Sequence, residues 1–298
     1  MPQQHEITIG YYPQHYQRRV LLAVIGLTPQ VITETVYALA HQTIPFYPTE
    51  LHIITTSEGF ARIRLTLLGD YPAWLARLSQ DYSLPNISFD ESHIHLLSNE
   101  QGVILDDIRT DADNECLADT ITRTIANLTR DHDCALHVSL AGGRKTMGYY
   151  AGYALSLFAR PQDRLSHVLV SSPFESHPDF YYPTPYRNII YTRDQKPLNT
   201  QEALVSLAQI PFVRLRHELP IELLASELSF SQTVEKAQIA LAPPSLVFNV
   251  EEKQIIAGGK HIALSPILIA FYWLFIDECL RQGVGIHYNT TADLTLRF

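Results

Sequence analysis

Apolar strands and amphipathic helices alternate along the first part of the chain. Residues 18–25 contain a continuous apolar run that ends at Gly26, which is typical of a strand buried on both faces of a parallel sheet. Residues 29–40 follow with apolar side chains at helical spacing, and Pro29 suits a first turn with Thr28 as its N-cap. The same patterns predict further strands at 51–57, 93–97, 134–143 and 165–172, and further helices at 61–68, 73–78, 111–131 and 144–160.

This alternation predicts the fold class. Strands that alternate with helices over about 160 residues are typical of a doubly wound α/β sheet. We therefore expect a Rossmann-like fold with a mostly parallel sheet. In such a sheet, ligands bind beyond the carboxyl ends of the strands.

The pattern changes after residue 172. Residues 173–199 are rich in Pro and Tyr, which predicts extended or hairpin segments leading to a linker near residues 193–200. We therefore expect two domains, at residues 1–195 and 201–298.

The second expected domain is a small α+β region. Residues 245–264 predict a hairpin with Gly258 and Gly259 at or near its turn. Residues 265–283 predict a helix with Ser265 as its N-cap. A strand pair followed by a helix suggests part of a winged helix-turn-helix.

Composition narrows the class of protein. The 298 residues are 46% hydrophobic and 18% charged, which excludes a disordered or fibrous chain. No apolar run reaches the roughly 18 residues that a membrane helix needs, and the first residues lack the apolar core of a secretory signal. Three widely separated cysteines form neither a disulfide framework nor a metal knuckle, so a reducing cytoplasm is the expected location.

The charge bears on possible partners. A formal net charge of −9 argues against a protein that coats duplex nucleic acid, because such binding depends on clustered Lys and Arg. A small phosphate-bearing ligand in a local pocket remains compatible with it.

Two loops after predicted strands have the chemistry to hold an anion. In residues 26–30, backbone N–H groups, the helix N-terminus and the Thr28 hydroxyl can donate to a phosphate, although many capped helices look similar. In residues 139–146, two glycines precede Arg144, Lys145 and Thr146. Cations at a helix N-terminus oppose the helix dipole, and an anionic ligand offsets that conflict. Two such loops facing one crevice predict a phosphate-rich ligand.

The remaining motifs are weaker. The chain has neither the G-x-G-x-x-G fingerprint nor the Walker A spacing, so we expect no dinucleotide cofactor. His93 and His95 share one strand face at a spacing compatible with a metal, but no carboxylate or cysteine cluster is near them in the sequence, so packing in the sheet is favoured and no metal is predicted.

Four segments resemble a known family. They are LLAVIGLTPQVITETVYALA (residues 21–40), DDIRTDADNECLAD (106–119), HVSLAGGRKTMGYYAGYALSLFAR (137–160) and LSHVLVSSPFE (165–175). Over roughly residues 18–187 the chain resembles the CRISPR-associated family with the CRISPR-associated Rossmann fold, or CARF domain. Its G-L-[ST]-P-Q and S-L-A-G-G-R-K-T motifs are specific, and they are similar to those of stand-alone ring nucleases.

The resemblance implies a function in antiviral defence. CARF domains sense cyclic oligoadenylates in type III CRISPR systems, and ring nucleases cleave cyclic tetra-adenylate to switch the response off. The resemblance also implies a homodimer with a two-fold ligand across both copies, no metal or cofactor, and attack by a ribose 2′-OH on its own 3′ phosphate. The products are linear di-adenylate with a 2′,3′-cyclic phosphate.

The resemblance also implies roles for particular residues. Thr28 and Lys145 match the catalytic hydroxyl and lysine, with Arg144 in support, although the family often has serine at the position of Thr28. Position in the sequence, independently of the resemblance, suggests further ligand-binding residues in the two loops and on nearby segments: Gly26, Leu27, Pro29, Gln30, Thr33, Glu58, Gly59, Arg109, Ala141, Gly142, Gly143, Thr146 and His177.

The carboxyl-terminal region leaves two alternatives open. Arg281 and His287 have the spacing of a HEPN ribonuclease motif, but glycines between them interrupt a helix. Glu251 and Lys253 match half of a PD-(D/E)xK nuclease motif. From residue 201 onward, seven Lys and Arg stand against ten Asp and Glu, which argues against a DNA-recognition helix. A sensor or regulator that does not cleave, and an effector nuclease activated by the messenger, therefore remain alternatives to a ring nuclease.

Overall fold

The computed structural model describes residues 11–283 except positions 226, 244, 250, 253 and 259. The chain divides into two compact units at the Val234–Glu235 boundary, which lies within one helix, α7 (Phe230–Leu241). This boundary differs from the one expected between residues 195 and 201.

The first unit is built on a six-stranded mixed sheet with the strand order β3-β2-β1-β4-β5-β8. Its strands are β1 (Arg18–Val24), β2 (Glu50–Thr55), β3 (Ile94–Leu96), β4 (Cys134–Ser139), β5 (Arg164–Val170) and β8 (Val205–Gln209). The first five strands pair in parallel, and β8 pairs antiparallel with β5 at one edge. The mostly parallel α/β sheet predicted from the sequence is confirmed.

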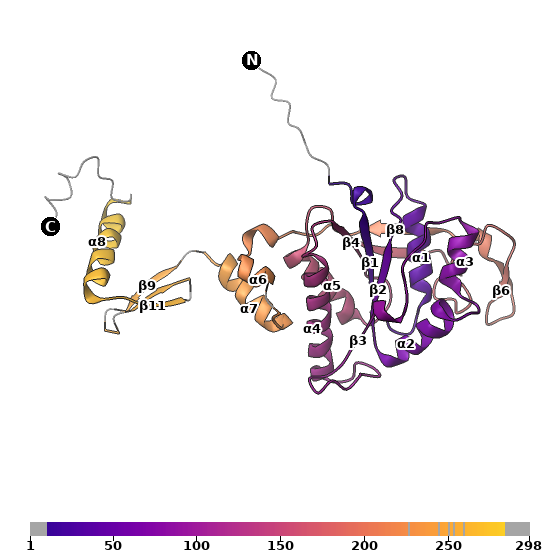
Figure 1. The fold of residues 1–298 in the computed structure, drawn as a ribbon, viewed down its shortest axis with the longest axis horizontal. Helices are drawn as coiled ribbons and strands as arrows, with labels where there is room; N and C mark the ends of the chain where they lie inside the picture. The colour runs from indigo at the N-terminus through magenta and orange to yellow at the C-terminus, as the bar shows by residue number, and fades with distance from the viewer. Residues whose placement is uncertain are drawn as a thin grey trace, which may run out of the picture. The chain divides into compact units, whose positions relative to one another are not determined.

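Helices cover both faces of this sheet. They are α1 (Gln30–Ala40), α2 (Ser57–Ile63), α3 (Trp74–Asp81), α4 (Asp111–Leu128) and α5 (Lys145–Phe158). In Figure 1, α1 and α3 lie on one side of the strands, and α4 and α5 lie on the other. Leu21 of β1 belongs to one core cluster with Ile32 and Leu39 of α1. Because β1 is covered on both faces, its sequence from Val20 onward is uniformly apolar and buried.

Several predicted boundaries differ from the structure. Thr28 is not the N-cap of α1; Pro29 holds that position, without a side-chain hydrogen bond. The helix predicted at 61–68 begins earlier as α2 and continues as a π-helical turn at Arg64–Leu68. The strand predicted at 134–143 ends at Ser139, before two glycines with positive φ.

Residues 171–204 are part of the first unit and contain a small hairpin. Strands β6 (Ile189–Tyr191) and β7 (Pro197–Asn199) form an antiparallel hairpin. Phe174, Phe180 and Ile190 form a small buried cluster there. The linker predicted near residues 193–200 is therefore wrong, because these residues form the turn and second strand of the hairpin. The chain then continues through β8 and the short helix α6 (Ile221–Ala225).

The second unit contains an antiparallel sheet and one long helix. Its strands are β9 (Leu246–Asn249), β10 (Gln254–Ala257) and β11 (Lys260–Ala263), in the order β11-β10-β9. The predicted hairpin is thus a three-stranded meander, with Gly258 at the β10–β11 turn; Gly259 lies outside the described residues. Helix α8 (Pro266–Gln282) confirms the predicted helix and its Ser265 N-cap. The winged-helix arrangement stays a prediction, and Lys253 and residues 284–298 with His287 are outside the described residues.

None of the helices among the described residues is long and apolar enough to cross a membrane.

Glu34 is a buried carboxyl in α1. Glu34 is only 6% exposed to solvent. Burial, followed by the negative charge of Glu175, raises the pKa of Glu34 to about 7 from 4.5. Between these two pH values the folded chain binds more protons than the unfolded chain. Glu34 therefore makes the free energy of unfolding fall as the pH rises from about 4.5 to about 7.

We expect Glu34→Gln to remove this penalty. The substitution should raise the free energy of unfolding by roughly 1–3 kcal/mol at pH 8 and by much less at pH 5. Urea unfolding of both proteins at the two pH values measures the difference. An equal change at both pH values would show that Glu34 is not buried as a carboxyl whose protonation is linked to folding.

Candidate functional site

The order of the strands creates a crevice between β1 and β4. These strands are neighbours, with Ala23 opposite Ser139 near their carboxyl ends. Helices α1 and α5, which follow them, lie on opposite faces of the sheet (Figure 1). The two connecting loops therefore diverge at this edge, which is where open α/β sheets bind ligands. The loops also touch, since a Cβ atom on Gly26 would lie 3.4 Å from the Gly143 Cα.

A pocket of about 260 Å³ lies at this crevice. Its walls come from the loops after β1, β2 and β4, and from the segment before α4. The lining residues are Gly26, Leu27, Thr28, Thr56, Glu58, Asp107, Gly143, Arg144 and Met147.

Glycine is required at two close approaches beside the pocket. Gly143 has φ +73°, and a Cβ atom there would lie 2.4 Å from the Met147 Sδ. A Cβ atom on Gly59 of α2 would lie 2.0 Å from the Thr55 Oγ1 and 2.7 Å from the Gly26 carbonyl oxygen. The loop after β1 can therefore rest directly on α2 only while residue 59 is glycine.

The pocket presents backbone donors. The N–H groups of Leu27, Thr28, Gly142 and Gly143 have no acceptor among the residues that the structure describes. The N-terminus of α5 begins beside them at Lys145. Unsatisfied N–H groups and a helix N-terminus together favour an anion.

The cations of the second loop differ in their partners. Arg144 holds the Asp107 carboxylate with two nitrogens, Nε at 3.1 Å from Oδ1 and Nη2 at 2.5 Å from Oδ2. The Arg144 guanidinium also holds the pKa of the Asp107 carboxyl below its usual range. Lys145 is exposed and forms no ion pair within the described ranges. Lys145 is therefore the cation of this loop that can give its full charge to a ligand.

The predicted catalytic residues lie at one end of the crevice. Thr28 is exposed and lines the pocket from the loop after β1. Arg144 lines the same pocket from the loop after β4. Lys145 follows Arg144 directly but is not among the lining residues.

The predicted binding residues divide between the pocket and its support. Gly26, Leu27, Glu58 and Gly143 line the pocket. Four others are buried behind it, namely Pro29, Thr33, Gly59 and Ala141. Gly142 is next to the lining, while Arg109 and Thr146 are exposed outside it.

Three predicted binding residues hold the segment after β5 instead. The Thr33 hydroxyl donates to the Tyr181 carbonyl oxygen at 2.7 Å, and Gln30 donates to the Pro178 carbonyl oxygen at 2.9 Å. The His177 ring accepts from the Asp179 N–H through Nδ1 and contacts the Tyr191 carbonyl oxygen through Nε2. In this structure their polar groups fasten the segment to α1 and to the β6–β7 hairpin.

Three wall residues were not predicted: Thr56, Asp107 and Met147. Thr56 could have been found, because it lies near the carboxyl end of the strand predicted at 51–57, at the ligand edge of the sheet. Asp107 lies in one of the segments that carry the family resemblance, but its pairing with Arg144 spans 37 residues. For Met147 the sequence holds no signal beyond its position in the first turn of a helix.

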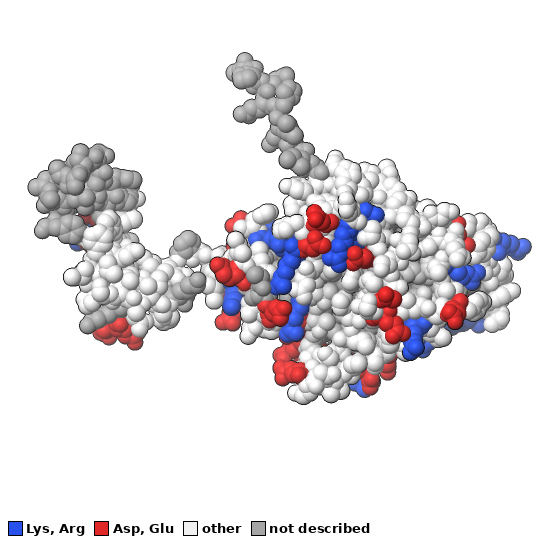
Figure 2. All heavy atoms as spheres, viewed as in Figure 1, with Lys and Arg blue, Asp and Glu red and all other residues white. Residues whose placement is uncertain are grey.

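Charge is mixed on the surface around these elements. On the face of the first unit shown in Figure 2, Lys and Arg side chains lie among Asp and Glu side chains. On that face they do not gather into one continuous positive surface.

The geometry is that of an α/β protein with a pocket at its topological switch point, beside which backbone N–H groups lie open. Comparison with known families then places the chain. Residues 28–243 match the family model described as CRISPR-associated protein NE0113; this range begins at Thr28 within the first loop of the crevice and includes the whole second loop. The protein therefore belongs to this CRISPR-associated family. The comparison with curated proteins finds no match.

We expect Gly59→Ala to destabilise the chain by roughly 1–3 kcal/mol, because the new methyl group meets the backbone of the loop after β1. Displacing Thr55 would also break the 2.8 Å hydrogen bond from its hydroxyl to the Ile25 carbonyl oxygen. Urea unfolding measures the change.

Gly148→Ala is the matched control. Gly148 lies in helix α5, and a Cβ atom on it would meet nothing within 4 Å. Its expected effect is a stabilisation of about 0.5–1 kcal/mol from helix propensity. Equal effects of the two substitutions would contradict the close packing at Gly59.

Proposed function

We propose that this protein binds a cyclic oligoadenylate at the crevice between β1 and β4 and cleaves cyclic tetra-adenylate as a ring nuclease. The observation that carries the proposal is the pocket where Thr28, open backbone N–H groups and the N-terminus of α5 converge. Membership of a CRISPR-associated family and the resemblance to CARF domains support this choice of ligand.

In the proposed reaction the protein positions a phosphate and stabilises the negative charge that develops on its oxygens. A ribose 2′-oxygen attacks the adjacent 3′ phosphorus while the bond to the 5′-oxygen breaks in line, and water accepts and supplies the protons. Thr28 and the loop N–H groups hold the phosphate, and Lys145 stabilises the charge that builds on its oxygens. Arg144, fixed by Asp107, orients the loop that carries Lys145. No metal takes part in these steps.

A ring ligand would span two copies of the chain. A pocket of about 260 Å³ is smaller than the roughly 300–1,000 Å³ of ordinary small-molecule sites. One copy would therefore hold part of a tetra-adenylate ring, and a two-fold related copy would hold the rest.

A sensor that binds without cleaving is the second candidate. The observation that favours it is the Arg144–Asp107 ion pair, which compensates one of the two cations beside the pocket. With a single uncompensated cation, the site offers less stabilisation to the transition state than two free cations would, while it can still hold a ground-state phosphate.

Incubation with labelled cyclic tetra-adenylate in EDTA tests cleavage directly. We expect linear di-adenylate with a 2′,3′-cyclic phosphate, resolved by chromatography, because the proposed steps use no metal. Tight binding without product would exclude the nuclease and establish the sensor. Neither binding nor cleavage would refute both candidates.

Lys145→Ala tests the assigned cation. We expect cleavage to fall by roughly 100-fold to 1,000-fold, as when a transition-state donor is removed, with the urea midpoint unchanged. Lys145→Arg should recover part of the activity. Lys196→Ala, at an exposed position in the β6–β7 turn, is the matched control and should cleave like the unmodified chain. Full activity of Lys145→Ala would overturn the assignment.

A further inference from the structure

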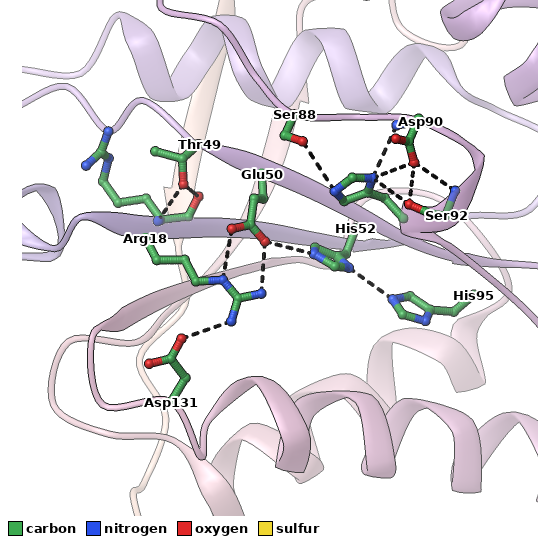
Figure 3. A network of polar contacts seen from close by, with 11 residues as sticks. Arg18, Thr49, Glu50, His52, Ser88, Asp90, Ser92, His95 and Asp131 are labelled. Carbon is green, nitrogen blue, oxygen red and sulfur yellow. Dashed lines mark hydrogen bonds and ion pairs between the residues drawn. The ribbon is translucent and has the colours of Figure 1, made fainter.

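A second polar cluster lies near the opposite end of β2 from the pocket (Figure 3). Glu50 and His52 are two residues apart on β2, so their side chains point to the same face of the sheet. His95 of β3 pairs with Ile54, which places its side chain on that face too. His93 ends the short 3₁₀ helix η3 (Glu91–His93), just before β3. The pair on β2 and the pair formed by His93 and His95 therefore face each other. Together they supply three imidazoles and one carboxylate.

The cluster has the dimensions of a metal site. One ligand atom each from Glu50, His52 and His93 lies within 4.8 Å of the others. The His52 Nε2 is 3.2 Å from the Glu50 Oε2, which is close to the separation of two ligands on one tetrahedral ion. All three residues are partly buried, which limits competition from water.

We propose that Glu50, His52 and His93 bind one divalent transition-metal ion of the Zn²⁺ type. Two imidazole nitrogens and one carboxylate oxygen are a common ligand set for Zn²⁺, and they leave a fourth position for water. This inference concerns a site separate from the crevice and does not depend on the proposed function.

Neighbouring groups hold the imidazoles in the orientation that a metal needs. The Asp90 Oδ1 is 2.9 Å from the His93 Nδ1, so the His93 Nε2 is the ligand atom, and a metal would replace its long 3.5 Å contact with the Ser88 hydroxyl. The His52 Nδ1 lies 3.1 Å from the His95 Nε2, so His52 can keep its proton on Nδ1 and present the Nε2 lone pair to the metal. A carboxylate or other acceptor behind a ligating histidine is the usual outer arrangement of such sites.

The charge of the network favours a divalent cation. Arg18 pairs with Glu50 at 2.9 Å and with Asp131 at 3.0 Å. Asp90, which contacts His93 instead of Arg18, adds a third carboxylate to one guanidinium, and the imidazoles are neutral when they ligate a metal. The network therefore carries a net formal charge of −2, which one divalent ion neutralises.

The position of the site indicates its role. β3 has only three residues and forms an edge of the sheet. A metal between His93 and the β2 ligands would fasten the η3–β3 segment to the sheet. Glu50 pairs with Val20, whereas the pocket begins after Val24, so the metal would stabilise this edge and stay outside the crevice.

Zinc titration of the full-length, untagged chain tests the proposal. After dialysis against EDTA and then chelator-free buffer, ZnCl₂ is added and followed by calorimetry, with bound metal counted by mass spectrometry. We expect one Zn²⁺ per chain and a higher melting temperature in its presence. Failure to bind Zn²⁺ would overturn the proposal.

Variants locate the bound ion. Asp90→Asn should weaken Zn²⁺ binding by about 10-fold, and His52→Gln and His93→Gln should weaken it further. His132→Gln, at an exposed position before β4, is the matched control and should bind like the unmodified chain. Urea midpoints without metal show whether each variant folds. Because the Asp90 side chain is exposed, Asp90→Asn should change metal binding without disturbing the packing of the sheet. Unchanged binding by Asp90→Asn and both histidine variants would overturn the site.

Cobalt substitution separates this site from the cysteines. Cys116 and Cys279 are free thiols with at least partial exposure, and thiolates also bind Zn²⁺. We expect the Co²⁺ form to show visible d–d absorption without a thiolate-to-metal charge-transfer band. A strong thiolate band would place the ion on cysteine and refute the assignment.

Discussion

The parallel pairing of β1 with β2 on one side and β4 on the other is the constraint on which the rest of the structure depends. Leu21 and Leu22 point to opposite faces, and both are fully buried, so each face needs its own layer of helices. Because parallel strands require crossover connections, α1 and α5 leave the adjacent ends of β1 and β4 toward opposite faces. The crevice is thus a consequence of the strand order, and the loops add the chemistry.

The chemistry of the crevice is set by a local electrostatic conflict. Arg144 and Lys145 lie where the dipole of α5 disfavours positive charge. Asp107 resolves half of this conflict with a two-nitrogen ion pair, and its own pKa falls as a result. The other half remains at Lys145. A bound phosphate is the simplest group that would resolve it, since it would meet both the helix N-terminus and the lysine.

The strands and helices of the first unit could be predicted because burial on two faces leaves a pattern in the sequence. β1 and α5 are examples, since apolar runs and helical spacing mark them directly. A hairpin was expected somewhere in residues 173–199, but its position at residues 189–199 and its attachment could not be predicted in the same way. Their order comes from contacts between distant residues, such as the Thr33 hydroxyl with the Tyr181 carbonyl oxygen, 148 positions away.

The residues of the candidate site also differ in whether local sequence or long-range contacts set their positions. Thr28 and Gly143 were predicted because Thr28 follows one predicted strand and Gly143 ends another, where topology alone puts both at the ligand edge. Asp107 was missed because its place depends on how residues 97–110 return across the end of β2. In the structure, the Ser57 N–H donates to the Leu105 carbonyl oxygen and the Ser57 hydroxyl donates to Asp106.

β2 links the two polar regions of the first unit. Its carboxyl end leads into Thr56, which caps α2 and lines the pocket, while its amino end carries Glu50 and His52. Ile53 and Ile54 between them are fully buried, so the strand is held rigidly on both faces. The buried centre of β2 therefore keeps the two regions apart, with the histidine cluster beside the sheet edge and the open backbone N–H groups at the crevice.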